Sequence, residues 1–248
     1  MDIRVGTSGW SYDAWKHGFY EGVPRRRWLA HYAAHFDAVE VNATFCGALA
    51  PATLRAWRAA TPPGFVFCIK ASRFLTHIRR LDFDRASLDR LRRQGDALAG
   101  KLGVVLWQLP QDLKRDDALL DRFLGRLRHW KSARHAVEFR SRDWFCEPVA
   151  GRLDAAGFAI VQSHAPDWPM WERVAGDFVY LRLHGWQRLY RSAYATTTLG
   201  RWAKRIRRWQ SEGRSVHVYF DNTDQGNAVR NAMKLNELVG MQRQHHLC

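Results

Sequence analysis

The chain alternates between short, almost continuous hydrophobic runs and longer segments in which apolar residues recur every three or four positions. Runs of roughly four to eight residues rich in Val, Ile, Leu and Phe are typical of strands buried on both faces of a parallel sheet. There are eight such runs, at residues 3–6, 38–45, 65–71, 103–109, 135–140, 158–163, 178–184 and 216–220. The pattern therefore predicts eight parallel strands.

The segments between the runs are mostly amphipathic, as helices that lie on a sheet are. In residues 199–209, Leu199, Trp202 and Ile206 fall on one face and basic residues on the other. Residues 27–36, 87–102, 116–127 and 229–239 also have helical spacing. The connection after the sixth run contains Pro166 and Pro169, which predicts a loop or a single turn there.

Eight strand-and-helix units in 248 residues predict an α/β fold of the single-domain (β/α)8 TIM-barrel type, with a short or missing helix between strands 6 and 7. Because no linker composition interrupts the chain, we expect one domain at residues 1–240, followed by a polar tail at residues 241–248.

Nearly every predicted strand becomes polar at its carboxyl end, where TIM-barrel sites lie. The polar residues are Glu40 and Asn42, Lys70, Gln108, Glu138 and Arg140, Gln162 and His164, Arg182 and His184, and Asp221 or Asn222. Each strand could simply turn polar where it meets solvent, or the charges could form a structural network in the lumen. Glu40, Glu138 and Arg182 still precede apolar strand residues, however, and a buried charge is costly unless it is paired or functional. We therefore expect a shared binding pocket.

Seven motifs occur in order: GTSGWSYDAW, VEVNATF, KASRFLTH, LWQLP, AVEFRSRDWF, FVYLRLHG and VYFDNTDQGNAVRNA. Together they resemble the YecE-like family, bacterial proteins that carry a domain of unknown function, and the resemblance runs from about residue 3 to residue 238. It implies a TIM-barrel-like fold and no established reaction. The polar residues that recur in the family fall here on Glu40, Asn42, Lys70, His77, Gln108, Glu138, Arg140, Arg182, His184 and Asn222. Cys46 and His164 depart from the pattern, which has an aromatic and an acidic residue there, so a carboxylate on strand 6 is in doubt.

The charge favours an anionic ligand. Lys and Arg number 39 against 24 Asp and Glu, a net charge of +15, which attracts nucleic acid or small anions, although Arg-rich codon usage also explains part of it. At the predicted pocket, Lys70, Arg140 and Arg182 outnumber Glu40 and Glu138. We expect an enzyme that acts on a phosphorylated or other anionic substrate, with phosphoester hydrolysis as the most specific version. Glu138 is the first candidate for the general base and Glu40 the second, and His184 and His77 are candidate acids or bases.

Two other functions remain open. A nucleic-acid-binding module without catalysis would stack bases on aromatic residues near the barrel mouth, expected at Trp10, Trp107, Trp144, Tyr190 and Tyr194. A glycosidase would use Glu40 and Glu138 as its carboxylate pair, with Trp10, Trp15 or Trp144 as sugar platforms. Among these aromatics, Trp10 and Tyr190 are expected to bind substrate in the pocket. A backbone cradle for an anion is expected at residues 6–9.

No motif requires a cofactor, because neither a nucleotide-binding glycine pattern nor an H-x-H or H-E-x-x-H metal motif is present. Glu40, Glu138, His164, His184 and Asp221 could still hold a single divalent metal. No run of 18 apolar residues and no signal peptide is present, so we expect a cytoplasmic protein without membrane contact. Its four cysteines are expected to be free thiols, and its oligomeric state is open.

Overall fold

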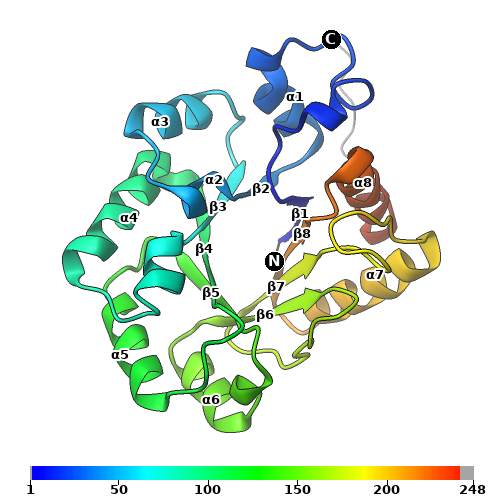
Figure 1. The fold of residues 1–248 in the computed structure, drawn as a ribbon. Coiled ribbons are helices and arrows are strands. Elements are labelled where there is room, and N and C mark those ends of the chain that lie inside the picture. Colours follow the sequence, from blue (N-terminus) through cyan, green and yellow to red (C-terminus); the bar gives the residue numbers. More distant parts are fainter. Residues whose placement is uncertain (1, 241–248) are drawn as a thin grey trace.

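A computed structural model describes residues 2–240, and within them eight strands run parallel to one another. The strands are β1 (Ile3–Thr7), β2 (Ala38–Val41), β3 (Val66–Lys70), β4 (Leu102–Gln108), β5 (Arg134–Glu138), β6 (Ala159–His164), β7 (Phe178–Leu183) and β8 (Ser215–Phe220). They pair in the order β1-β8-β7-β6-β5-β4-β3-β2. The strands form the centre of a nearly closed barrel and the helices surround it (Figure 1). The predicted TIM-barrel-like fold and single domain are confirmed.

The helices begin where the sequence supplies start signals. They are α1 (Trp28–His35), α2 (Ala43–Cys46), α3 (Pro51–Ala59), α4 (Arg85–Leu98), α5 (Asp117–Leu127), α6 (Glu147–Ala155), α7 (Thr196–Ser211) and α8 (Asn227–Val239). Asp84 and Asp116 cap α4 and α5 by accepting hydrogen bonds from the backbone N–H groups of Ser87 (2.8 Å) and Leu119 (2.9 Å). Residues 165–177, between β6 and β7, contain no helix, as predicted.

Short helical turns connect the larger elements. They are η1 (Asp13–Trp15), η2 (Arg25–Arg27), η3 (Phe74–Ile78), η4 (Ala99–Lys101), η5 (Arg142–Trp144) and η6 (Asp224–Gly226). Among them η3, which follows β3, has π-helical hydrogen bonding. A π-turn next to a strand end often marks a functional position.

Alternating strand residues build two separate cores. One set packs under the helices, and the other fills the barrel lumen with Cys68, Leu106, Ala136, Tyr180, Tyr219 and their neighbours. The next residues on the lumen face, one pleat further toward the carboxyl ends, include Lys70, Glu138 and Arg182. The lower lumen, toward the amino ends of the strands, is therefore apolar and aromatic. The upper lumen, toward their carboxyl ends, is charged.

The seam between β1 and β2 is the weakest part of the barrel wall. It is reduced to a bridge between Ser8 and Glu40, and the N–H of Gly9 donates to the carbonyl of Glu40 at 2.7 Å. Tyr32 of α1 also spans the seam, because its hydroxyl accepts from the N–H of Thr7 and donates to the carbonyl of Ala38. At this seam the two backbones approach each other closely.

Gly6 makes that approach sterically possible. A Cβ at this position would lie 2.1 Å from the carbonyl oxygen of Ala38, a backbone atom that cannot swing away. We therefore expect Gly6→Ala to lower the free energy of unfolding by about 1–3 kcal/mol, measured by urea denaturation. Gly125→Ala on α5 is the control, because its Cβ meets open space and a helical Ala should stabilise by up to about 1 kcal/mol. Equal stability of Gly6→Ala and wild type would contradict the close seam.

Several sequence predictions of local structure are wrong or fall elsewhere. The second run ends as a strand at Val41, and α2 begins at Ala43, so Asn42 is the N-cap of α2 and not a strand residue. Cys46 is exposed on α2, whereas Cys68 is buried, and both are free thiols. Helices α3 and α6 are implied by the predicted (β/α)8 fold, although no residue ranges were predicted for them. The predicted tail at residues 241–248, including Cys248, lies outside the described residues. No helix in residues 2–240 is long and apolar enough to cross a membrane.

Candidate functional site

Arg182 is the centre of a charged layer in the upper lumen. Its guanidinium donates to Glu40 from Nη2 (2.7 Å to Oε1) and from Nε (2.9 Å to Oε2). It also donates from Nη1 to Glu138 (2.9 Å) and from Nη2 to Asp221 (3.2 Å). Only 1% of Arg182 is exposed. Strand β7 thus places one arginine where it neutralises carboxylates from β2, from β5 and from just beyond β8.

Glu40 is held on both oxygens. Besides Arg182, the hydroxyl of Ser8 donates to Oε1 at 2.5 Å and the hydroxyl of Tyr180 donates to Oε2 at 2.8 Å. Asn42 donates in turn to the oxygen of Ser8 at 2.7 Å. Glu40 is fully buried with these partners, so its role is to position Arg182.

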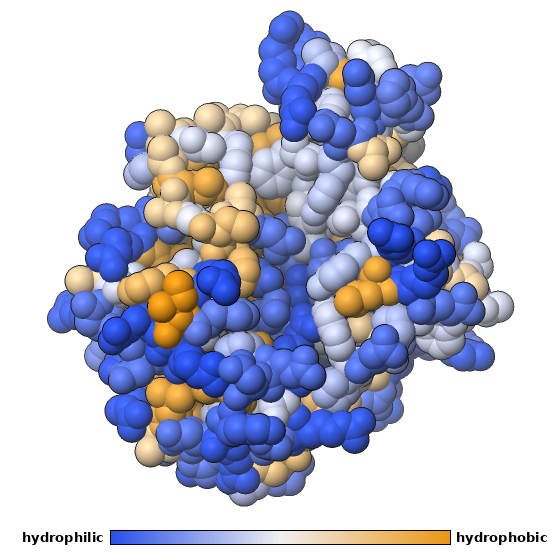
Figure 2. All heavy atoms as spheres, viewed as in Figure 1, coloured by the Kyte–Doolittle hydropathy of each residue, from blue (hydrophilic) through white to orange (hydrophobic). Residues whose placement is uncertain are grey.

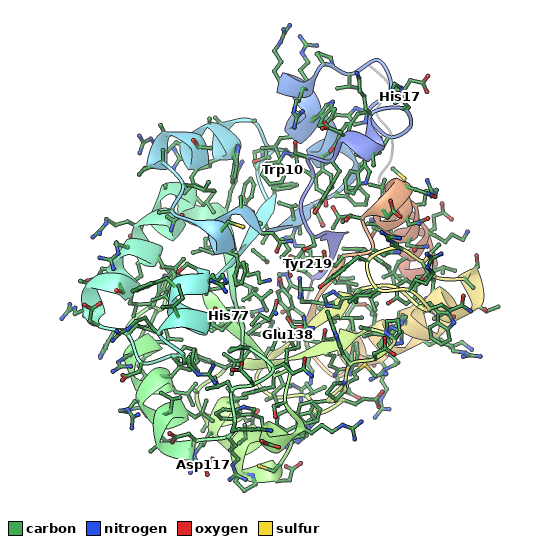
Figure 3. All side chains as sticks on the ribbon, in the orientation of Figure 1. Trp10, His17, His77, Asp117, Glu138 and Tyr219 are labelled. Carbon is green, nitrogen blue, oxygen red and sulfur yellow. The ribbon has the colours of Figure 1, made fainter. Side chains whose placement is uncertain are left out.

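Glu138 lies near the centre of the barrel and connects this buried layer with the rim above it (Figure 3). Its Oε2 accepts from Arg182, and its Oε1 lies 2.7 Å from Nη2 of Arg140. Burial alone would raise the pKa of Glu138, but the guanidinium groups of Arg140 and Arg182 outweigh it and hold that pKa well below the usual range. Glu138 is therefore ionised at neutral pH.

His184 and Asp221 form a second pair. Nδ1 of His184 lies 3.0 Å from Oδ2 of Asp221, and Nε2 accepts from Nη1 of Arg182 at 3.4 Å. Burial and the charge of Arg182 lower the pKa of His184, so the ring is neutral at pH 7. In this arrangement Nδ1 carries the proton and Nε2 is the basic nitrogen. The rings of Trp168 and Tyr190 cover His184, with centroids 4.7 Å and 5.7 Å away.

A small cavity opens above this layer, between the ends of β4 and β5 and the loop that follows β6. Its volume is about 240 Å³, and it is lined by His77, Gln108, Leu109, Pro110, Gln111, Arg140, Trp168 and Pro169. The guanidinium of Arg140 lies flat on the Trp168 ring, 3.4 Å from its centroid. On the face shown in Figure 2, the surface over the centre of the barrel is a hydrophilic hollow. Hydrophobic surface lies over α2 and over the segment after β3.

Lys70 lies near His77, one of the residues that line this cavity, and has no charge partner. Its Nζ lies 4.1 Å above the Phe45 ring, whose other neighbour is His77 at 5.2 Å. Within residues 2–240, Nζ makes no hydrogen bond and no ion pair. Burial and the charge of Arg182 lower the pKa of Lys70 to about 8, although Glu138, Glu40 and Asp221 act in the opposite direction. Burial also lowers the pKa of His77, and the charge of Lys70 adds to that effect.

The remaining predicted pocket residues are less central. Asn222 is fully buried and donates to the carbonyl of Ser192 and to Oδ1 of Asn231, so it joins β8 to α8 and to the segment before α7. Trp10 is half-buried and packs edge-on against Trp57 at 4.7 Å. Tyr190 is 43% exposed at the rim. Asp221, which was left as an alternative to Asn222, is the residue after β8 that reaches the charged layer.

Strand 6 presents a different face from the one expected. Gln162 donates to the carbonyl of Glu172 and accepts from Arg205 of α7, and His164 bonds Tyr194 and stacks on Trp186. Both side chains therefore lie in the helix layer, away from the lumen. Ser163 is the lumen residue of this strand and neighbours Glu138.

Three of the five aromatics expected near the mouth are structural. Trp107 is buried and donates to Nδ1 of His135, Trp144 is buried and donates to the carbonyl of Leu113, and Tyr194 is buried beside His164. Trp15 is buried as well. The expected backbone cradle is also wrong, because the N–H groups of Thr7, Ser8 and Gly9 bond Tyr32, Phe220 and Glu40.

The charge balance of the mouth changes once Asp221 is included. Lys70, Arg140 and Arg182 then face three carboxylates instead of two, so the layer as a whole is neutral when His184 is neutral. The carboxylates are committed to Arg182, Arg140 or His184, whereas Lys70 is not. In the part of the chain that the structure describes, no group of three or more His, Cys, Asp or Glu is arranged to hold a metal ion.

Comparison with known proteins agrees with the fold. The family described as "Protein of unknown function DUF72" matches residues 4–247, nearly the whole chain. The UPF0759 protein YunF of Bacillus subtilis (strain 168) is 24% identical over 282 residues, spanning 97% of this chain and 95% of YunF.

Solved structures of the same kind superpose well. A DUF72 family protein from Thermotoga maritima MSB8 gives a TM-score of 0.85 at 25% identity, covering 96% of this chain and 99% of its own. Another, from Enterococcus faecalis V583, gives 0.82 at 19% identity, covering 98% and 97%. A GH5_18 protein from Bifidobacterium longum shares only the fold, with a TM-score of 0.57 at 11% identity over 99% of this chain and 79% of its own. The name YecE-like is not confirmed by these comparisons, which show the DUF72 family. The chain belongs to the DUF72 family of proteins of unknown function.

Proposed function

We propose that this protein is an enzyme that binds a small anionic substrate at the barrel mouth, between Lys70 and Arg140. One observation carries the proposal: Lys70 is a half-buried cation without a carboxylate partner, and it shares the Phe45 ring with His77, which lines a cavity of about 240 Å³ together with Arg140 and Gln108. An anion placed there would give Lys70 the counter-charge that it lacks. Arg140 would supply a planar donor that the Trp168 ring holds in place.

Two members of the buried layer, Arg182 and Glu40, support this arrangement without contacting the substrate. Arg182 is saturated by Glu40, Glu138 and Asp221, so it fixes the floor of the site and does not bind the ligand. Glu138 and His184 are the candidate general bases, since Glu138 is ionised and Nε2 of His184 is basic. Hydrolysis of a phosphoester is the specific reaction that this set would perform.

The geometry favours this function over a glycosidase. Such an enzyme needs one carboxylic acid that is protonated at working pH. Glu138 is held ionised by two guanidinium groups, and Glu40 has both oxygens occupied. Neither side chain supplies the acid.

Binding of inorganic phosphate tests the proposal. We expect wild type to bind phosphate by calorimetry and Arg140→Met to bind at least about tenfold more weakly, because a charge-assisted hydrogen bond contributes about 1.5–3 kcal/mol. Arg134→Met is the matched control: Arg134 starts β5, pairs with Asp177 and lies six residues before Arg140 on the same segment. Its phosphate affinity should equal that of wild type.

The same variants separate catalysis from nucleic-acid binding. An enzyme should turn over at least one member of a phosphoester panel, and Glu138→Gln should remove that turnover. Single-stranded oligonucleotide is titrated at two salt concentrations alongside. Strong, salt-dependent oligonucleotide binding without phosphate binding or turnover would refute the enzyme and favour a nucleic-acid-binding module.

A further inference from the structure

Lys70 differs from the other lysines of this arginine-rich chain. The sequence has only seven lysines, and Lys70 is the one whose amine lies in the barrel lumen. The others are exposed or already hold a partner: Lys16, Lys131 and Lys204 are exposed, and Lys101, Lys114 and Lys234 bind backbone carbonyls or carboxylates. The amine of Lys70 is thus placed for chemistry and not for structural pairing.

The surroundings of Lys70 favour a neutral amine. Nζ lies over the face of Phe45, and the nearby carboxylates are drawn toward Arg182. Burial and the positive charge of Arg182 lower the pKa of Lys70 to about 8, against the opposite effect of the carboxylates. Lys70 is then unprotonated in roughly one tenth of the molecules at pH 7, and in about half of them at pH 8. A neutral lysine amine in a partly desolvated pocket is a nucleophile toward carbonyl carbon.

We propose that Lys70 forms an imine with the carbonyl carbon of a small anionic aldehyde or ketone, whose phosphate or carboxylate group is bound at Arg140. This inference rests on the anion-binding function proposed above and names its substrate class. The cavity of about 240 Å³ suits a molecule of a few carbons. Lys70 ends β3 and Arg140 follows β5, so one small molecule can present its carbonyl to the first and its charge to the second.

The step balances without an oxidant or a metal. The nitrogen lone pair of Lys70 attacks the carbonyl carbon, and the C=O π electrons move to oxygen, which takes up a proton. The added nitrogen then releases a proton, the hydroxyl group leaves with a proton as water, and the nitrogen lone pair forms the C=N bond of an iminium ion. The iminium nitrogen releases its remaining proton to give the imine. One amine and one carbonyl thus give one imine and one water. His77 shares the Phe45 ring with Lys70, and its Nδ1 is bonded to Thr76, so its Nε2 is placed to transfer the proton of the departing hydroxyl.

Reductive trapping tests the imine. Wild-type protein is incubated with dihydroxyacetone phosphate or with pyruvate, in the presence of sodium cyanoborohydride, and the product is mapped by peptide mass spectrometry. We expect one adduct per chain on the Lys70 peptide, and inorganic phosphate should slow its formation. The rate should rise about fivefold from pH 7 to pH 8 and then level off, whereas an ordinary lysine keeps gaining about tenfold per pH unit up to about pH 10.

Two variants complete the test. K70R should give no specific adduct. Lys101→Arg replaces the lysine that ends η4, directly before β4, and should give the wild-type adduct. Adducts spread over the exposed lysines, or equal trapping in K70R, would overturn the inference, and the wild-type peptide map decides this even if K70R fails to fold. Phosphate binding that depends on Arg140, together with no trapping at Lys70, would refute the imine and leave the proposed function standing. Absence of both would refute the proposed function as well.

Discussion

Arg182→Met should lower the free energy of unfolding by about 3–5 kcal/mol, because it leaves buried carboxylates without their cation. Glu40 and Glu138 are fully buried, and each gives up at least one strong hydrogen bond in the variant. For a chain of this size the loss corresponds to a melting temperature lower by roughly 10 °C. Urea denaturation of the purified variant measures it directly.

The control is an arginine that contacts two carboxylates at the surface. Arg152 of α6 contacts Asp121 at 3.0 Å and Asp117 at 3.5 Å, but about a third of its side chain is exposed. Arg152→Met should cost less than about 1 kcal/mol. Adding Glu40→Gln to Arg182→Met should restore part of the stability by removing one uncompensated charge. If the two arginine variants cost the same, the buried charges do not depend on Arg182.

The hydrophobic runs were sufficient to predict the barrel, but not the outer ends of its strands. Strands with continuous runs of Val, Ile and Leu are typical of parallel sheets that are buried on both faces. At 38–45 the apolar pattern continues beyond the strand, because Ala43, Thr44 and Cys46 turn into α2 without a change in composition. The bounds of helices α3 and α6 were not predicted, although each has a proline in its first turn, a start signal that was not used.

The candidate site depended on which face each strand turns inward, and sequence alone leaves that undecided. A strand has a period of two, so a shift of one residue exchanges lumen and helix layer. On β6 the larger polar residues Gln162 and His164 were chosen, but Ser163 faces the lumen. After β8 the same ambiguity was left open, and Asp221 rather than Asn222 reaches Arg182. The partners of Arg182 come from elements up to 142 residues apart, which no local pattern encodes.

The described charges divide into a floor and a rim. The floor is formed by Glu40, Glu138 and Arg182, which are fully buried and bonded to one another. The rim carries Lys70 and Arg140, which are less buried and lie beside the cavity. The floor carries one net negative charge, and its carboxylates pair with Arg182 and Arg140 and not with Lys70. The rim therefore supplies the cations of the proposed anion site.

Acid should destabilise the fold well before the carboxylates titrate, because two histidines are buried in neutral form. Burial lowers the pKa of His135 to about 4 and that of His217 to about 3, from an ordinary value of 6.5. Nδ1 of His135 accepts a hydrogen bond from Nε1 of Trp107, and Nε2 faces the carbonyl of Trp130. A proton added to Nδ1 would point at the N–H of Trp107. Since each folded pKa is depressed, this stability is fully present above about pH 6.5 and is lost as pH falls toward the folded value. Between pH 6.5 and 5 the two groups together should remove about 3 kcal/mol.

The slope of stability against pH isolates this effect from the packing cost of any substitution. His217→Gln and His135→Gln should each flatten the slope between pH 6.5 and 5 by about 1 kcal/mol per pH unit on average, whatever they cost at pH 8. His17→Gln changes an exposed ring and should leave the slope unchanged. An unchanged slope in both buried variants would mean that His135 and His217 accept protons in the folded barrel. A charged His217 would then lie next to Tyr219 and Cys68 and would need water around it. The lower lumen is apolar and does not provide that environment.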